Sequence, residues 1–196
     1  MSFKSSTLAA ITVVAALFGP AQAAVVTFAP LTSASQGPAG DGTTYLESGL
    51  TFTSSVVSSS ALYHWGTTQS FNADPTGATL FQNFPGQSLI VTQTGGGDFF
   101  LNSFDLADAY NTGAASVILF TYTDGTGTYS SNLTLDSLIG LQTFSFGMTV
   151  SSFSLRQDSP YFQIDNVVFN GGHVPEPTSL ALLGLGLIAL RLGKRK

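Results

Sequence analysis

The side chains that could do chemistry in this chain are mainly carboxylates. The two histidines, His64 and His173, lie far apart, cysteine is absent, and the motifs Gly-x-Ser-x-Gly, Ser-x-x-Lys and His-Glu-x-x-His do not occur. The lack of cysteine excludes thiol catalysis, thiolate metal sites and disulfides. Asp105 and Asp108 could in principle serve a glycoside hydrolase, which needs two carboxyl groups at a set separation. Carboxylates in exposed turns explain this pair better, so we expect the protein not to be an enzyme.

The charge balance limits the partners of the central part of the chain. Between residues 24 and 174, Arg156 is the only basic residue, whereas ten residues carry carboxylates. This segment therefore has a net charge near −9, although the whole chain has a formal charge of −5. Such a field repels phosphate backbones, which argues against nucleic acid as a partner. It favours divalent cations, which prefer carboxylate and carbonyl oxygens, so Ca²⁺ is the cofactor that this composition suits best.

One aromatic run is a candidate carbohydrate-binding site. Tyr63, His64 and Trp65 are consecutive, and Trp65 is the single tryptophan of the chain. An aromatic ring can pack on the C–H face of a pyranose, and the nearby Gln69 and Asn72 could bond to its hydroxyl groups. The alternative is that Trp65 belongs to the core, because alternation along a strand exposes at most one face of the triplet.

The elements that must position these residues are predicted to be β-strands. Short runs rich in Val, Thr, Phe and Tyr recur at intervals of about 8–12 residues, which predicts an all-β fold, an antiparallel β-sandwich of the jelly-roll kind. The clearest hairpin joins 116–123 to 126–135 through Asp124-Gly125, and we expect its first arm to be covered on both faces. Loops are expected at 29–44 and 66–78. The other expected strands are 24–28, 45–57, 61–65, 88–93, 98–106, 141–150, 152–157 and 161–170.

The N-terminal end has the features of a secretory signal peptide. Lys4 supplies a positive charge, residues 8–18 form an apolar core of 11 residues, and Ala21-Gln22-Ala23 is a cleavage site of the Ala-x-Ala type. The apolar core is too short for a lasting membrane span. We expect signal peptidase to cleave after Ala23.

The C-terminal end combines prolines, an apolar run and a basic terminus. The segment Val174-Pro175-Glu176-Pro177 is predicted to be extended and exposed, because proline lacks a backbone N–H group and disfavours helix before it. The 13 residues 178–190 carry no charge, and four basic residues follow. A full membrane span needs roughly 20 apolar residues, so this run spans only with its neighbours recruited. The basic end predicts a cytoplasmic C-terminus. An ordinary anchor or a core helix is the alternative, although a core helix should not end in clustered cations.

This order of features closely resembles the PEP-CTERM sorting signal of Gram-negative bacteria. The resemblance implies that Val174, Pro175, Glu176 and Pro177 are recognised by a membrane-embedded exosortase, thought to act as a transpeptidase, and that the apolar helix is then discarded. It also implies an intermediate in the inner membrane before the protein reaches the cell surface or extracellular matrix. Together these features predict three parts: a signal peptide at 1–23, a β-sandwich at 24–172 and a sorting signal with a short transmembrane helix at 173–196.

The central segment resembles exported β-sandwich cargo domains that carry this same tail and, more distantly, galactose-binding-like and carbohydrate-binding jelly rolls. The resemblance lies in residues 98–106 and 162–169. In such jelly rolls a structural Ca²⁺ often ties an early strand to the last one, which implies Glu47 and Asp165 as ligands, with Asp41 as a further candidate. The alternative is that Glu47 is solvated and that Asp165 caps a bulge or a turn.

The tail implies, by resemblance, an association with extracellular polysaccharide or biofilm. The leading expectation is therefore a structural or adhesive component of the matrix. A carbohydrate-binding module acting through Trp65 is the alternative. A weak glycoside hydrolase acting through Asp105 or Asp108 is a third hypothesis.

Overall fold

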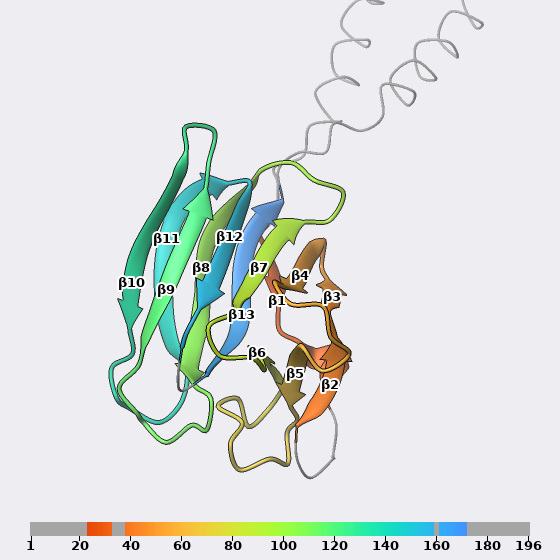
Figure 1. The fold of residues 1–196 in the computed structure, drawn as a ribbon, viewed down its shortest axis with the longest axis vertical. Helices are drawn as coiled ribbons and strands as arrows, with labels where there is room; N and C mark the ends of the chain where they lie inside the picture. The colour runs from red at the N-terminus through yellow and green to blue at the C-terminus, as the bar shows by residue number, and fades with distance from the viewer. Residues whose placement is uncertain (1–22, 33–37, 159–160, 172–196) are drawn as a thin grey trace, which may run out of the picture.

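Two antiparallel β-sheets packed face to face make up the part of the chain that the computed structural model describes, residues 23–32, 38–158 and 161–171 (Figure 1). The fold class predicted from strand spacing is thus confirmed. The Pro-Glu-Pro segment, the apolar C-terminal run and all of the predicted signal peptide except Ala23 lie outside the described residues. In the described ranges, no helix has the length and apolar character needed to cross a membrane.

The first sheet has seven strands and the second has six. The strands of the first sheet are β1 (Ala23–Val26), β2 (Ala39–Gly42), β5 (Leu62–Trp65), β6 (Thr79–Gln82), β8 (Phe99–Asp108), β11 (Gln142–Val150) and β13 (Phe162–Gly171). Those of the second are β3 (Thr44–Glu47), β4 (Leu50–Ser54), β7 (Ser88–Gln93), β9 (Val117–Thr123), β10 (Thr128–Thr134) and β12 (Ser152–Arg156).

The strand orders place the hairpin β9–β10 and the paired strands β8 and β11 at one side of the sandwich. The first sheet runs β11-β8-β13-β6-β5-β2, with β1 also paired to β13, and the second runs β10-β9-β12-β7-β4-β3. In Figure 1, β10 and β11 lie at one side and β2 and β3 at the other. A single 3-10 turn, η1 (Ala29–Leu31), follows β1.

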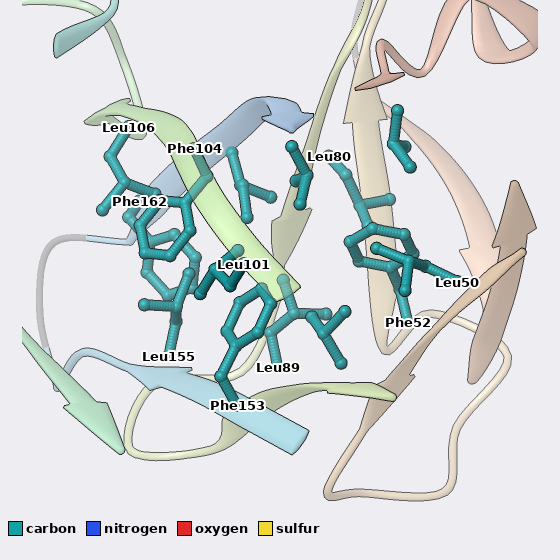
Figure 2. Packing of buried hydrophobic residues seen from close by; sticks show 14 of the residues in the cluster. Leu50, Phe52, Leu80, Leu89, Leu101, Phe104, Leu106, Phe153, Leu155 and Phe162 are labelled. Carbon is teal, nitrogen blue, oxygen red and sulfur yellow. The ribbon is translucent and has the colours of Figure 1, made fainter. Parts of the chain in front are cut away.

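The core lies between the sheets and is built largely from phenylalanine and leucine. Phe104 of β8 packs on Phe120 of β9 and Phe153 of β12, with ring centroids 5.8 and 5.4 Å apart. Figure 2 shows Leu50 and Phe52 of β4 at the opposite end of the same cluster. Each fully buried side chain of this size contributes roughly 1.5–3 kcal/mol. The sandwich is therefore held by apolar burial from strands of both sheets.

Some early strands differ from the prediction. The expected single strand 45–57 is a hairpin, β3 and β4, because Ser48 and Gly49 turn the chain with φ values of 51° and 89°. The expected loop 29–44 contains η1 and β2, and β6 was not predicted at all. The sequence of β2 is Ala-Gly-Asp-Gly, so pairing with β5 defines this strand rather than any β-propensity.

The prediction that the first arm of the hairpin is covered on both faces is wrong. Ile118 and Phe120 are buried, but Val117 and Leu119 are 53% and 37% exposed. Apolar residues on both faces of a strand suggest cover on both sides, but only the inner face of β9 meets the other sheet. The outer face of β9 is therefore an open apolar surface.

Candidate functional site

The loop 66–78 covers the outer face of the first sheet, where a buried amide holds it. Gln163 of β13 is fully buried, with its neighbours along the strand facing the core. Its Nε2 donates to the carbonyls of Phe71 and Asp108 at 2.7 and 2.9 Å, and its Oε1 accepts from the N–H of Ala73 at 3.1 Å. Sequence reasoning missed Gln163, although a glutamine between apolar residues of a strand is a signal for such a role.

Trp65 is used in packing beneath this loop. It is 5% exposed, stacks on Phe81 at 5.2 Å and meets Phe71 edge-on at 5.5 Å. Its Nε1 donates to the carbonyl of Ala109 at 2.9 Å. This arrangement matches the alternative considered above, a tryptophan of the core. Stacking of a sugar on Trp65 stays a prediction, and it requires Phe71 to move away from the indole.

The other members of the predicted sugar site are also engaged. Tyr63 stacks on Phe81 at 5.9 Å. Asn72 is 5% exposed, and its Nδ2 donates to the carbonyls of Gly66, Asp74 and Gly77. Gln69 is 8% exposed. The side chains expected to reach sugar hydroxyls therefore hold the loop in place in this structure.

His64 faces the opposite side of β5 and pairs with Asp41. Its Nδ1 lies 2.9 Å from both carboxylate oxygens of Asp41, and the side chains are 8% and 9% exposed. A carboxylate on Nδ1 orients an imidazole as it does in a nucleophilic triad. The buried Nε2 has no hydrogen-bond partner. Asp41, a candidate calcium ligand, is thus engaged with His64, a contact that the sequence did not predict.

Glu47 links Thr27, the residue that follows β1, to β3. Its Oε1 accepts from the backbone N–H of Thr27 at 3.1 Å and its Oε2 from the hydroxyl of Tyr45 at 2.7 Å. Burial and the hydrogen bond to Glu47 raise the pKa of Tyr45, so this hydroxyl stays protonated and keeps donating. Both carboxylate oxygens of Glu47 therefore have protein donors.

Asp165 lies fully buried at a bulge in β13. The pairing of β13 with β8 shifts register between Asp165 and Val168, and Asn166 has a φ of 47°. Asp165 Oδ1 accepts the N–H of Asn166 at 2.7 Å, while Oδ2 has no partner. This geometry is the bulge cap that was considered as the alternative to a calcium ligand.

Two more carboxylates lie beside Asp165. Burial raises the pKa of Asp165 to about 8; the N–H of Asn166 opposes this, and the charges of Asp74 and Asp105 add to it. Once protonated, Asp165 can donate to Asp74, which favours the neutral form. Asp105 accepts from Nδ2 of Asn166 at 2.9 Å and from Oγ1 of Thr143 at 2.6 Å. Burial and the neighbouring carboxylates therefore raise the pKa of Asp165 and favour its neutral form.

The structure does not gather a ligand set around Glu47 and Asp165. Among the residues described, no group of three or more histidine, aspartate or glutamate side chains has the arrangement that holds a metal ion. Carboxylate oxygens remain the donors that Ca²⁺ prefers, and the Oδ2 atom of Asp165 is unpartnered. Calcium binding stays a prediction.

The predicted hydrolase pair is not brought to one face. Asp105 and Asp108 are three residues apart in β8, so their side chains point to opposite faces. Asp108 is 3% exposed and accepts the backbone N–H groups of Tyr110, Thr112 and Gly113. Its carboxylate therefore fixes the loop that follows β8.

An open hollow of about 300 Å³ lies over the outer face of the second sheet. Arg156 Nη2 contacts Asp158 Oδ1 at 3.1 Å there, and Gln157 is 5% exposed with neither amide atom bonded. Sequence reasoning noted Arg156 as a lone cation but did not place it in a site. The hollow is lined by Val117, Leu119, Asn132, Arg156, Gln157 and Asp158.

Comparison with protein families finds one motif, at the C-terminal end. The family described as the PEP-CTERM protein-sorting motif matches residues 173–196. The chain carries a PEP-CTERM sorting motif. This PEP-CTERM protein is therefore exported, passing through the membrane to the cell surface, and the motif implies processing by an exosortase. The PEP-CTERM motif that was predicted from the Pro-Glu-Pro tail is confirmed, while the removal of the apolar run stays a prediction. None of the curated proteins compared matches the chain.

The solved structures that are similar to the sandwich include three carbohydrate-binding modules. The family 32 carbohydrate-binding module of Clostridium perfringens NanJ, in complex with galactose, has 13% identity and a TM-score of 0.42 and covers 64% of this chain and 98% of its own. The module of AlyQ, with 4,5-unsaturated mannuronic acid, has 18% identity, a TM-score of 0.39 and coverage of 67% and 98%. Module CBM32-5 of CpGH89 from C. perfringens, in complex with GalNAc-β-1,3-galactose, has 13% identity and a TM-score of 0.36. It covers 63% of this chain and 96% of its own. At these values the similarity carries no information about a ligand of this protein.

Proposed function

We propose that this PEP-CTERM protein is a structural or adhesive component of the cell surface or extracellular matrix of a Gram-negative bacterium, associated with extracellular polysaccharide or biofilm. The observation that carries the proposal is the sorting motif at 173–196, which follows the β-sandwich. A domain delivered by this route acts outside the cell. There, a stable domain can contact matrix components through its exposed surface, as an adhesive role requires.

The use of the buried polar groups supports a structural role. Asp108, Gln163 and Asn72 each spend several hydrogen-bonding atoms on backbone groups of loops. Such bonds stabilise loops, because an unpaired buried polar group costs about 1–3 kcal/mol. These polar side chains are thus used to hold loops within the fold, in keeping with the expectation of a protein without catalytic activity.

Fractionation of native cells tests this proposal. We expect to find the protein in the matrix fraction. We also expect a strain that lacks the protein to retain less polysaccharide on its surface. Glu176→Gln should keep the protein in the inner membrane, because it alters the sorting motif, whereas Asp158→Asn, a matched change at an exposed carboxylate, should not. Protein found free in the medium, with unchanged polysaccharide in the deletion strain, would contradict the proposal.

Carbohydrate binding is a second candidate function, and the hollow on the second sheet favours it. Asn132 and Arg156 offer donors there beside the exposed apolar side chains of Val117 and Leu119. A sugar presents hydroxyl groups and C–H faces to such a mixed surface. On a glycan array, Arg156→Gln should remove binding through the hollow, whereas Trp65→Ala should remove binding through the aromatic triplet. Binding by neither wild type nor variants would end this candidate.

A further inference from the structure

Strand β10 differs from the other strands that end the two sheet orders. β2 and β3 have four residues each and contain Asp41 and Glu47. The register of β2 shifts between Gly40 and Gly42, and that of β11 shifts between Ser145 and Met148. Short length, charges and bulges all discourage the addition of another strand to a sheet edge. Each of these three strands therefore carries a protective feature.

β10 has none of these features. It has seven residues, Thr-Tyr-Ser-Ser-Asn-Leu-Thr, without charge, proline or glycine. It pairs with β9 in one unbroken register, and six of its seven residues are exposed. The carboxylates nearest in sequence, Asp124 and Asp136, lie beyond its two ends. β10 is thus a long, neutral edge that is open to pairing.

The backbone groups that β10 leaves free follow from its ladder with β9. The N–H of Leu135 donates to the carbonyl of Ser116, and that of Asp124 donates to the carbonyl of Gly127. Hydrogen-bonded and non-hydrogen-bonded pairs alternate in an antiparallel ladder. The odd-numbered residues from 127 to 135 therefore turn their N–H and C=O groups toward β9. The even-numbered residues turn theirs to the open edge: Thr128, Ser130, Asn132 and Thr134.

We propose that β10 pairs antiparallel with β10 of a second copy of this chain, in a register centred on Ser131. This register opposes Thr128 to Thr134 and Ser130 to Asn132 across a twofold axis, so the open-edge groups of all four residues are bonded. A register centred on Ser130 or Asn132 leaves some of them unpaired. The interface is isologous, as twofold contacts are, and it joins two six-stranded sheets into one.

The side chains fit the same register. Tyr129 of one copy lies opposite Leu133 of the other, and such aromatic–aliphatic pairs stabilise antiparallel strands. Tyr129 is 44% exposed in the single chain and stacks on Tyr122 at 5.3 Å, so its ring is already held in place. Ser131 lies opposite Ser131 of the second copy, and neither a large side chain nor a charge there opposes the approach of the two strands. This self-complementarity is the reason to choose a second copy as the occupant, and it goes beyond the proposed function by saying how copies associate.

A single introduced cysteine tests the pairing, because the natural chain has none. Non-hydrogen-bonded pairs have Cα atoms about 4.5 Å apart, within the range of about 4.4–6.8 Å that a disulfide needs. We expect Ser131→Cys in the purified full chain to oxidise to a covalent dimer several-fold more than Ser145→Cys, a matched change on the exposed edge of β11. Equal yields, no dimer, or cross-linking of Ser131→Cys to a different protein in cells would overturn the proposal.

Further variants test the register and the edge itself. Thr128→Cys mixed with Thr134→Cys should cross-link, while either variant alone should not, because identical residues lie roughly 20 Å apart across the axis at about 3.4 Å per residue. Ser131→Lys places two like charges opposite each other and should give a monomer by analytical ultracentrifugation, whereas Ser131→Thr should remain a dimer. Cross-linking of the single variants as efficient as that of the mixture would contradict the antiparallel register.

Discussion

His64 Nδ1 lies 2.9 Å from both carboxylate oxygens of Asp41, and both side chains are more than nine-tenths buried. The pair joins the edge strand β2 to β5. Removing one member of this buried pair leaves the polar group of the other without its partner, which costs about 1–3 kcal/mol for a neutral group and more for a charged one. We expect Asp41→Ala and His64→Ala each to lower the free energy of unfolding by about 3 kcal/mol, measured by urea titration. The double variant should lose less than the sum, and strictly additive losses would contradict an energetic coupling.

The buried carboxyl of Asp165 should make stability depend on pH. Its pKa is about 8 in the folded protein and near 3.8 in the unfolded chain, so the folded state binds the proton more tightly. Its stabilising contribution is fully present below about pH 4 and is lost as pH rises to 8, with a slope of at most about 1.4 kcal/mol per pH unit. Asp165→Asn should abolish this slope, whereas the exposed Asp158→Asn should keep it. A slope unchanged in Asp165→Asn would contradict the assignment.

Calcium should compete with that proton if the predicted metal is bound. Millimolar Ca²⁺ should raise the melting temperature of the wild type, and the rise should be larger at pH 9 than at pH 6, because the ligand must be deprotonated. Asp165→Asn should lose the response, and Mg²⁺ should reproduce it less well because it demands a stricter geometry. A melting temperature that Ca²⁺ does not raise at any pH would contradict calcium binding.

The buried glutamines Gln163 and Gln157 should respond differently to the same substitution. Gln163 bonds to backbone groups of the loop 66–78 and of β8, whereas neither amide atom of Gln157 has a partner. Gln163→Leu should lower the free energy of unfolding by about 3 kcal/mol, since it leaves several buried groups unpaired. Gln157→Leu should be neutral or stabilising, because no hydrogen bond is lost. Equal losses in thermal denaturation would contradict this difference.

Local pattern predicted the later strands and the tail but not the polar contacts. β7, β9 and β11 have alternating or continuous apolar residues, which identify a strand without knowledge of its partners. β2 lacks such residues and is a strand only because β5 lies beside it. The bond between Gln163 and Phe71 joins residues 92 positions apart, and that between His64 and Asp41 joins residues 23 apart. Such contacts depend on how the sheets pack, which a single sequence does not specify.

The sorting motif could be identified because its signal is linear. The order of prolines, apolar run and basic end in residues 174–196 is complete without the rest of the fold. The sugar and calcium sites required a spatial arrangement instead. Trp65 is covered by Phe71 of loop 66–78, and Glu47 accepts a hydrogen bond from Thr27; both facts follow only from the packed structure.

Mass spectrometry of both ends of the protein, recovered from the surface of native cells, tests export through the sorting motif most directly. We expect an N-terminus at Ala24 and a C-terminus near residues 175–178, with the apolar run removed. Surface material that still ends in an intact Lys196 would contradict processing at this motif.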